Sequence, residues 1–176
     1  MEKKFIMTAF GKDRPGIVAD VSGVIYENGC NLEESQMGLL ADEFTLILLL
    51  SGQGDSLEEN LYRDCRRLEK EKAISLFLRP LNFEKKDYKT NGNNRHTISV
   101  EGIDQAGIVY KVSKFLADKS INIVTLTSQT KPSPESGTAL YVMKIDVVVP
   151  EALDKGSVEQ ELESIGKKLN VEISLD

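Results

Sequence analysis

The segment Asp13-Arg14-Pro15-Gly16-Ile17-Val18 is followed, 91 positions later, by the related segment Asp104-Gln105-Ala106-Gly107-Ile108-Val109. The same spacing separates Val21 from Val112, Ser22 from Ser113 and Asn31 from Asn122. A repeat with a constant offset indicates a duplicated domain. The chain has 176 residues, so we expect two small domains of roughly 80 residues each. The predicted domains are residues 1–81 and 96–176, joined by a polar linker at 82–95.

The hydrophobic pattern of the first half predicts two helices within a set of four strands. Alternation predicts a strand over residues 5–10, and helical spacing then predicts a helix that Asp13 opens and Gly29 ends. We expect a hairpin of strands at 31–39 and 44–50, a helix that Ser56 caps, and a last strand at 73–81. The buried stripe of the first helix is expected to consist of Ile17, Val18, Val21, Val24 and Ile25.

The second half repeats this order of elements. We expect strands at 96–101, 121–130, 138–149 and 171–175, with a turn at 131–137. The stripe of its first helix is expected to contain Ile108, Val109, Val112, Phe115 and Leu116. Both halves therefore read β-α-β-β-α-β. The predicted fold class is α+β: two ferredoxin-like domains in tandem, each an antiparallel sheet with both helices on one face.

The strand at 44–50 is apolar on both faces, which a lone domain of this plan does not explain. Two helices cover only one face of the sheet, yet Ile47 and Leu49 alternate with Leu46, Leu48 and Leu50. An uncovered apolar sheet favours aggregation. We therefore expect the second face to be buried against the other half of the chain or against another subunit, as in a homo-oligomer.

The turn between the first strand and first helix of each half is a candidate ligand site. Unpaired amides and the dipole at a helix N-terminus favour an anionic group such as a carboxylate. Gly16 and Gly107 would let a ligand approach the backbone, with Ile17 and Ile108 supplying an aliphatic pocket. Asn31 and Asn122 begin the second strand of each half, and we expect them beside the helix start, where they or carbonyl groups of the strands would meet an ammonium group. An alternative interpretation is that these residues only shape the chain.

Composition excludes several classes of function. The net charge of −6 and the pI near 5.0 oppose direct nucleic-acid binding, which needs a surplus of Lys and Arg. The two cysteines lack CxxC spacing, so neither a disulfide framework nor a zinc site is expected. No stretch reaches the ~20 apolar residues that span a bilayer, and no early stretch combines a basic start with a long apolar run. We expect a soluble, cytoplasmic protein that has no contact with a membrane.

Catalysis has little support in the sequence. The single histidine, His96, lies at the start of a strand beside the linker, and no Ser/His/Asp set forms without it. No cluster of His, Cys and Asp has the convergence that a metal requires. The basic run from Arg63 to Lys72 alternates with acidic residues, which is typical of a solvated, salt-bridged helix face. We therefore expect no enzyme activity, no cofactor and no metal.

The repeated segments resemble a known family. Asp13 to Val18, with the segment from Asn28 to Ser35, is similar to an ACT domain, and Asp104 to Val109 with the segment from Ser120 to Ile123 is similar to a second one. Among tandem ACT proteins without an attached enzyme, the chain most resembles the glycine cleavage system transcriptional repressor family. That similarity is carried by residues 31–35 and 43–46.

The resemblance implies a regulatory protein whose ACT units associate through their sheets and bind a small amino acid, with glycine favoured. Members of this family are thought to contact a LysR-type regulator rather than DNA. An alternative is an accessory regulatory subunit that docks onto an amino-acid metabolic enzyme. The second copy lacks the Arg-Pro pair of the first, so one loop could bind ligand while the other is architectural. The candidate ligand-binding residues are Asp13, Arg14, Pro15, Gly16, Ile17 and Asn31 in the first copy, and Asp104, Gln105, Ala106, Gly107, Ile108 and Asn122 in the second.

Overall fold

A computed structural model describes residues 2–81, 94–133 and 137–176. The chain divides into two compact units, Met1–Lys86 and Asp87–Asp176, called unit 1 and unit 2 below. Unit 1 contains β1 (Glu2–Lys12), α1 (Ile17–Glu27), β2 (Asn31–Leu40), β3 (Glu43–Gln53), α2 (Leu57–Lys72) and β4 (Ser75–Leu81). Unit 2 contains β5 (Arg95–Ile103), α3 (Ile108–Asp118), β6 (Asn122–Pro132), β7 (Ala139–Val148), α4 (Lys155–Leu169) and β8 (Val171–Leu175).

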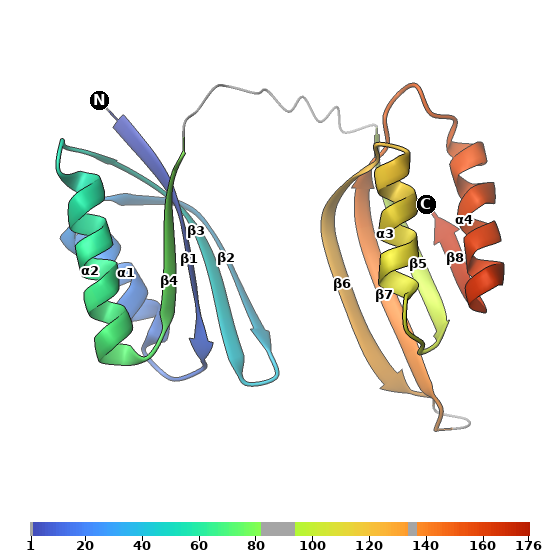
Figure 1. Ribbon diagram of the computed structural model, residues 1–176, viewed down its shortest axis with the longest axis horizontal. Coiled ribbons are helices and arrows are strands. Elements are labelled where there is room, and N and C mark those ends of the chain that lie inside the picture. Colours follow the sequence, from blue (N-terminus) through green and yellow to red (C-terminus); the bar gives the residue numbers. More distant parts are fainter. Residues whose placement is uncertain (1, 82–93, 134–136) are drawn as a thin grey trace. The chain divides into compact units, whose positions relative to one another are not determined.

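Each unit is a four-stranded sheet with both helices on one face (Figure 1). The strand orders are β2-β3-β1-β4 and β6-β7-β5-β8, and every pair of neighbouring strands is antiparallel. Both β2 and β6 carry a register shift near their start, between Leu32 and Glu34 and between Ile123 and Thr125. The predicted fold class of two ferredoxin-like domains in tandem is confirmed.

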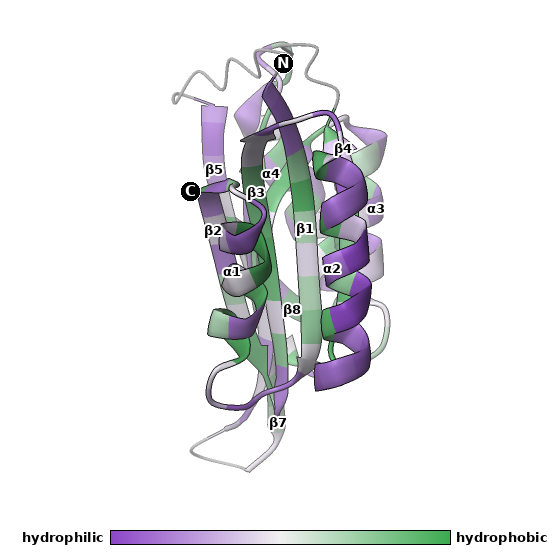
Figure 2. Ribbon diagram, turned by 90° about the vertical axis from the view of Figure 1, so that its left-hand side faces the viewer, coloured by the Kyte–Doolittle hydropathy of each residue, from purple (hydrophilic) through white to green (hydrophobic). Residues whose placement is uncertain are grey.

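Each hydrophobic core lies between the sheet and the two helices of its own unit. Alternate residues of β1 and β3, such as Phe5, Met7 and Leu48, are buried under α1 and α2. In Figure 2, β1 and β3 are largely hydrophobic, whereas the outward side of α2 is hydrophilic. This is the amphipathic pattern that places a helix on a sheet. The core of unit 2 repeats the arrangement around residues such as Ile98 and Met143.

The helix boundaries differ from the sequence prediction at several points. Asp13 does not open the first helix, because a turn separates it from α1, which begins at Ile17 with Gly16 at the N-cap position. Ser56 does occupy the N-cap position of α2, but its side chain makes no capping hydrogen bond. Val18 and Val109, both predicted to be buried, are 44% and 40% exposed. Each lies in the first turn of its helix, outside the row of residues that faces the core.

Among the described residues of unit 1, none covers the second face of the sheet. Ile47 is 43% exposed and Leu49 is half-buried, whereas Leu46 and Leu48 are buried on the helical side. The helices cover only that one side, so the predicted burial of the other face against another domain or subunit stays a prediction.

Some predictions concern residues that the structure describes only in part. The predicted linker at 82–95 and the predicted turn at 131–137 include residues 82–93 and 134–136, which lie outside the described residues. No helix in the described part of the chain is long and apolar enough to cross a membrane.

Candidate functional site

The turn between β1 and α1 has a conformation that its sequence dictates. Gly16 has φ 87° and ψ −5°, which matches the second central position of a type II turn. Pro15 occupies the first central position, which its fixed φ favours. The Ile17 N–H closes the turn by donating to the Arg14 carbonyl oxygen at 3.3 Å. The Pro-Gly pair therefore forms a tight turn that ends directly at the start of α1.

This turn presents free backbone donors at the helix N-terminus. The Asp20 N–H donates to the Gly16 carbonyl oxygen at 2.9 Å, which begins the helical hydrogen bonding. Among the described residues, no acceptor pairs with the N–H groups of Val18 and Ala19. Gly16 is exposed and has no side chain that would block access. Such donors, together with the helix dipole, can bind a carboxylate.

The Arg14 side chain folds back over the first turn of α1. Its Nη2 atom lies 2.6 Å from Asp20 Oδ2, and Lys72 Nζ lies 3.9 Å from the other Asp20 oxygen. The hydrogen bond from Arg14 holds the pKa of the Asp20 carboxyl below its usual value. Two cations and one carboxylate thus lie beside the turn, and the local charge favours an anionic ligand.

The equivalent turn of unit 2 has the same backbone shape but different contacts. Gly107 has φ 96° and ψ −2°, and the Lys111 N–H donates to its carbonyl oxygen at 2.9 Å. Gln105 stands where unit 1 has Arg14, and its side-chain amide donates to the carbonyl oxygen of Leu169 at the end of α4. Ala106 replaces the proline. This loop therefore lacks the cation of unit 1 and is tied to a helix terminus.

The structure does not place all the predicted ligand residues near these turns. Ile17 and Ile108 are 3% and 2% exposed and belong to the two hydrophobic cores, so the predicted aliphatic pocket is not formed by their side chains. Asp13, by contrast, lies on the exposed loop, where its N–H donates to the Asp42 carbonyl oxygen at 2.9 Å. Asp104 is also exposed and accepts a hydrogen bond from Thr130 Oγ1 at 3.3 Å.

The expectation that Asn31 and Asn122 lie beside the helix start is wrong. Asn31 pairs with Ser51, which pairs with Lys4 near the start of β1, whereas the turn follows Lys12 at the other end of that strand. Eight residues at about 3.3 Å each separate these ends by about 26 Å. The reason is topological, because α1 returns the chain to the end of the sheet where β1 begins. In unit 2, Asn122 pairs with Val148, which pairs with Arg95 at the start of β5. Asn122 therefore also lies at the opposite end of its sheet from the turn.

Two residues that the sequence reasoning assigned to the core instead lie at the turns. Val18 and Val109 are exposed apolar side chains in the first helical turn of each unit. Both are exposed and adjoin the turn, so they are candidates for an apolar contact with a ligand there. The signal in the sequence was their position directly after the repeated Gly-Ile pair.

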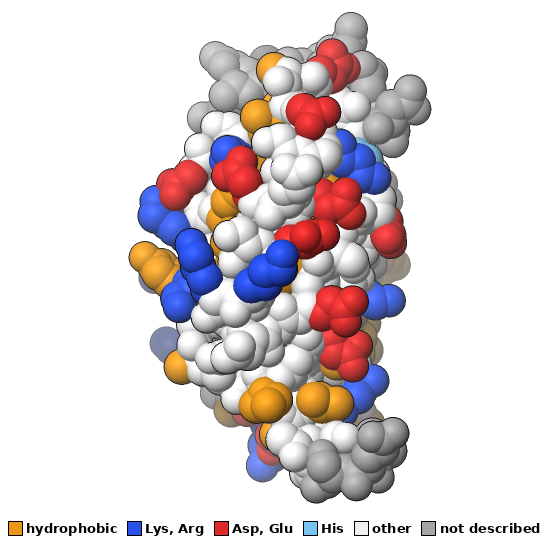
Figure 3. Space-filling view, turned by 90° about the vertical axis from the view of Figure 1, so that its right-hand side faces the viewer, with side chains coloured by type: hydrophobic (Ala, Val, Ile, Leu, Met, Phe, Trp, Pro, Cys, Tyr) orange, Lys and Arg blue, Asp and Glu red, His pale blue; other side chains and the backbone are white. Residues whose placement is uncertain are grey.

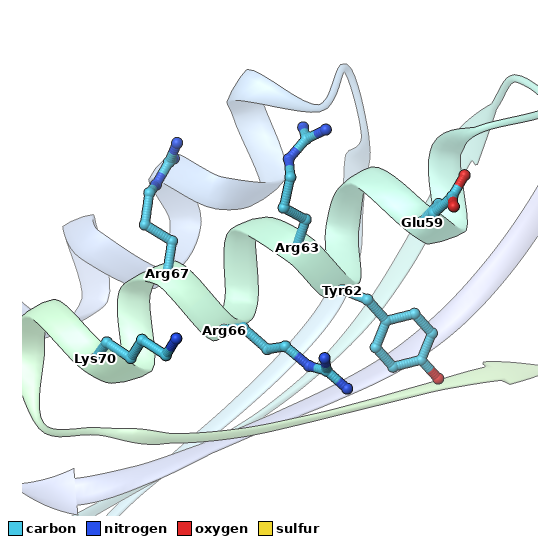
Figure 4. A pocket seen from close by; sticks show the side chains of 6 residues that line it. All are labelled: Glu59, Tyr62, Arg63, Arg66, Arg67 and Lys70. Atoms are coloured by element: carbon cyan, nitrogen blue, oxygen red, sulfur yellow. The ribbon is translucent and has the colours of Figure 1, made fainter.

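A surface hollow of about 760 Å³ lies along α2. Figure 4 shows that its basic side chains leave the helix in two directions, with Arg63 and Arg67 on one side and Arg66 on the other. Arg67 lies 3.3 Å from Glu27 and 3.6 Å from Asp64, and Arg63 lies 3.4 Å from Asp64. These ion pairs agree with the predicted salt-bridged helix face.

A second hollow, of about 510 Å³, lies at the start of β5 in unit 2. Its central carboxylate, Asp146, accepts hydrogen bonds from Thr97 at 3.0 Å and Thr125 at 2.5 Å. The Thr125 hydrogen bond, followed by that of Thr97, holds the pKa of Asp146 below its usual value. The carboxylate is thus satisfied within the sheet. His96 also lines this hollow, and its Nδ1 atom lies 2.5 Å from the Asp176 carbonyl oxygen.

The surface charge of unit 2 is mixed. Figure 3 shows acidic and basic side chains interspersed over the helical side of this unit. The Lys119 Nζ atom, for example, lies 2.7 Å from a carboxylate oxygen of Glu161. Within the described ranges, no group of three or more His, Cys, Asp or Glu side chains is placed to hold a metal ion.

Comparison with known proteins gives a consistent set of relatives. A family model for the ACT domain matches residues 3–78. The glycine cleavage system transcriptional repressor of Escherichia coli is 25% identical over 97% of this chain and 88% of its own length. The crystal structure of an unknown protein from Galdieria sulphuraria covers 100% of this chain and 98% of that one, with a TM-score of 0.81 and 29% identity.

A second solved structure, provisionally named as a glycine cleavage system transcriptional repressor, covers 100% of this chain and 97% of its own. Its TM-score is 0.69 and its identity 25%. The repressor and the two solved structures cover both units, whereas the family model covers residues 3–78. The ACT-domain model therefore covers most of unit 1, and the whole chain, whose two units share one fold, is similar to the glycine cleavage system transcriptional repressors.

Proposed function

We propose that this chain is an amino-acid-responsive regulator that binds a small amino acid, glycine first, at the turn of unit 1. The observation that carries the proposal is the type II turn at Pro15-Gly16, which leaves the amides of Val18 and Ala19 without acceptors among the described residues. A carboxylate there would accept from these amides and from the Arg14 guanidinium. The ligand would replace part of the contact between Arg14 and Asp20.

The ammonium group of the ligand needs an acceptor that the same unit does not place nearby. Asn31 lies at the opposite end of the sheet from its own turn. An antiparallel pairing of the β2 edge with the edge strand of another ACT unit would bring an asparagine of one unit to the turn of the other. Every residue of β2 is exposed, which leaves this edge open for such pairing.

The two units are proposed to differ in ligand binding. Arg14 supplies a cation beside the turn of unit 1, whereas Gln105 is engaged with the Leu169 carbonyl oxygen in unit 2. A charge-assisted hydrogen bond is roughly twice as strong as a neutral one. Unit 1 therefore binds the amino acid more tightly, and the loop of unit 2 has mainly an architectural role.

We further propose that the chain acts on transcription through a protein partner, such as a LysR-type regulator, rather than through DNA. The likeness to a transcriptional repressor of glycine cleavage supports a role in transcription. The net charge of −6 and the ion-paired arginines of α2 oppose direct contact with a polyanion. The regulated genes would be those of glycine cleavage or of amino-acid metabolism.

Titration calorimetry with glycine, alanine and serine on the full chain tests the ligand site. Glycine is expected to bind, and Arg14→Gln is expected to weaken binding about 10- to 100-fold, because one charge-assisted hydrogen bond is lost. Lys12→Gln, which removes an exposed cation beside the same turn, is the matched control and should leave affinity nearly unchanged. Equal affinity of wild type and Arg14→Gln would remove this site.

Affinity capture with the full chain, in the presence and absence of glycine, tests the partner. Recovery of a LysR-type regulator in a glycine-dependent manner supports the transcriptional role. Recovery of an amino-acid metabolic enzyme instead would favour an accessory regulatory subunit. A glycine-independent set of partners would contradict a ligand-controlled regulator.

A further inference from the structure

The outer face of sheet 1 is the side of β2-β3-β1-β4 that points away from α1 and α2. Directly paired residues of antiparallel strands point to the same face, so the register defines rows that cross the sheet. One row is Glu34, Leu49, Ile6 and Arg79, and the next is Gln36, Ile47, Thr8 and Phe77. The first row therefore has an apolar centre and opposite charges at its two ends, and the second row adds Ile47 and Phe77 to the apolar surface.

Several side chains of this face are open to solvent. Ile47 and Phe10 are each 43% exposed, and Phe77 is 66% exposed. The rings of Phe10 and Phe77 stack, with centroids 6.2 Å apart and planes 9° apart. A contiguous apolar surface of this kind marks an interaction site rather than scattered exposed residues.

The outer face of sheet 2 has a different chemistry. Its rows contain Thr125, Asp146 and Thr97, then Thr127, Lys144, Ser99 and Ser174, then Gln129, Val142, Glu101 and Glu172, and last Lys131, Leu140 and Ile103. Hydroxyl and charged groups dominate the first three rows, and they would lose water without gaining apolar contact if they covered sheet 1. The apolar partner that matches the outer face of sheet 1 is therefore another copy of the same face.

The charges at the two edges select one geometry for such a pair. Glu34 on β2 and Arg79 on β4 are both exposed and lie in the same row at opposite edges. A two-fold axis parallel to the strands, between β1 and β3, reverses the strand order of the second copy. That operation places Glu34 of each copy opposite Arg79 of the other. A two-fold axis in the plane of the sheet and perpendicular to the strands would instead place the β2 edge of one copy against the β2 edge of the other, and β4 against β4.

The shape of the face agrees with the same axis. A hollow of about 410 Å³ lies on this face, lined by residues that include Glu34, Gln36 and Ile47. The axis parallel to the strands puts Phe77 of the second copy over the row of Gln36 and Ile47. Phe77 is the most exposed apolar side chain in the two rows, and its stacking on Phe10 holds its ring in place. A protruding ring thus meets a hollow.

We propose that two copies of this chain associate through the outer faces of sheet 1, with a two-fold axis parallel to the strands. Glu34 and Arg79 pair across the interface at both edges, and Phe77 of each copy fills the hollow of the other. The packing is that of two aligned sheets. The inference goes beyond the proposed function, since no amino acid takes part and the surface is separate from the turn at Gly16.

Sedimentation velocity on the full chain, over a wide range of concentration, tests the proposal. Wild type is expected to form a dimer, and Glu34→Arg and Arg79→Glu are each expected to dissociate it at least ~100-fold more readily, because each creates two like-charge contacts. A mixture of the two single variants should dimerise again, since both contacts then join opposite charges. Glu101→Arg, on the outer face of sheet 2, is the matched control and should leave the dimer unchanged.

Each other result overturns the proposal. A wild-type chain that stays monomeric at every concentration would mean that another part of the chain or a different protein covers the face. A dimer that survives both single variants would use another surface. Failure of the mixed variants to recover would show that positions 34 and 79 do not meet. Recovery cannot arise from pairing of β2 edges alone, because Arg79 lies on β4 at the other side of the sheet.

Discussion

Replacing Gly16 or Gly107 by alanine tests whether backbone conformation alone demands glycine at the two turns. Both residues have a positive φ, 87° and 96°. A Cβ atom at Gly16 would have Arg14 Nη1, at 3.9 Å, as its nearest neighbour, and one at Gly107 would meet nothing within 4 Å. Each turn therefore has room for the alanine side chain, and the loss of stability comes from holding an L-residue in the left-handed backbone conformation. We expect each alanine to lower stability by about 1–2 kcal/mol.

Hydrogen exchange on the full chain, read by mass spectrometry, measures this loss unit by unit. Gly16→Ala should reduce protection mainly in α1, and Gly107→Ala mainly in α3. Gly102→Ala is a contrasting variant, because its Cβ would lie 2.7 Å from Val171 Cγ1 and 2.8 Å from Val171 Cα. Its cost comes from overpacking between β5 and β8. A loss above about 3 kcal/mol at Gly16 or Gly107, or no loss at all, would refute the conformational explanation.

Other variants test the cores and the cysteines. Asn28→Ala removes the amide that donates to Asp64 at 2.9 Å and should lower stability in urea by about 1–2 kcal/mol. That hydrogen bond holds the pKa of Asp64 below its usual value. The hydrogen bond therefore stabilises the fold at neutral pH, and this stabilisation is lost as the pH falls through the lowered pKa. The stability of Asn28→Ala should consequently depend less on acid pH than that of wild type. Gly166→Ala would bring Cβ to 2.7 Å from the Val171 carbonyl oxygen and should cost about 1–3 kcal/mol. Gly23→Ala, with nothing within 4 Å, should instead stabilise α1 by about 0.5–1 kcal/mol in the same assay. Burial raises the pKa of the Cys65 thiol to about 11, which keeps this thiol protonated and unreactive at neutral pH. Maleimide should therefore label the half-buried Cys30 before Cys65, and mass spectrometry over time shows which cysteine is labelled first.

Local signals in the sequence predicted most of the elements. Alternation identified β1, a continuous run of apolar residues identified β3, and the apolar spacing identified α1 and α3, because these signals follow from the geometry of one strand or one helix. The repeat at 91 positions also predicted that both units share one strand order. The start of α1 was misplaced because Asp13 resembles an N-cap, whereas the Pro15-Gly16 pair forms a turn before the helix.

The candidate site was predicted only in part, since its contacts join segments far apart in the chain. The glycine turns are local, and the sequence indicated them, but the amides without acceptors belong to Val18 and Ala19. Gln105 engages Leu169, 64 positions away, and no spacing rule predicts such a contact. Asn31 was assigned to the turn because it follows α1, but the crossover carries the chain to the other end of the sheet.

The amino-acid sequence by itself determined the duplication, the order of strands and helices, and the two glycine turns, because these depend on neighbouring residues and on the backbone freedom of glycine. Only the tertiary structure decided which ends of the strands lie together, which side chains hold the turns, and how charge is arranged across each sheet. Strand register and crossover geometry fix these relations between distant residues. They place Glu34 and Arg79 in one row although 45 positions separate them in the chain.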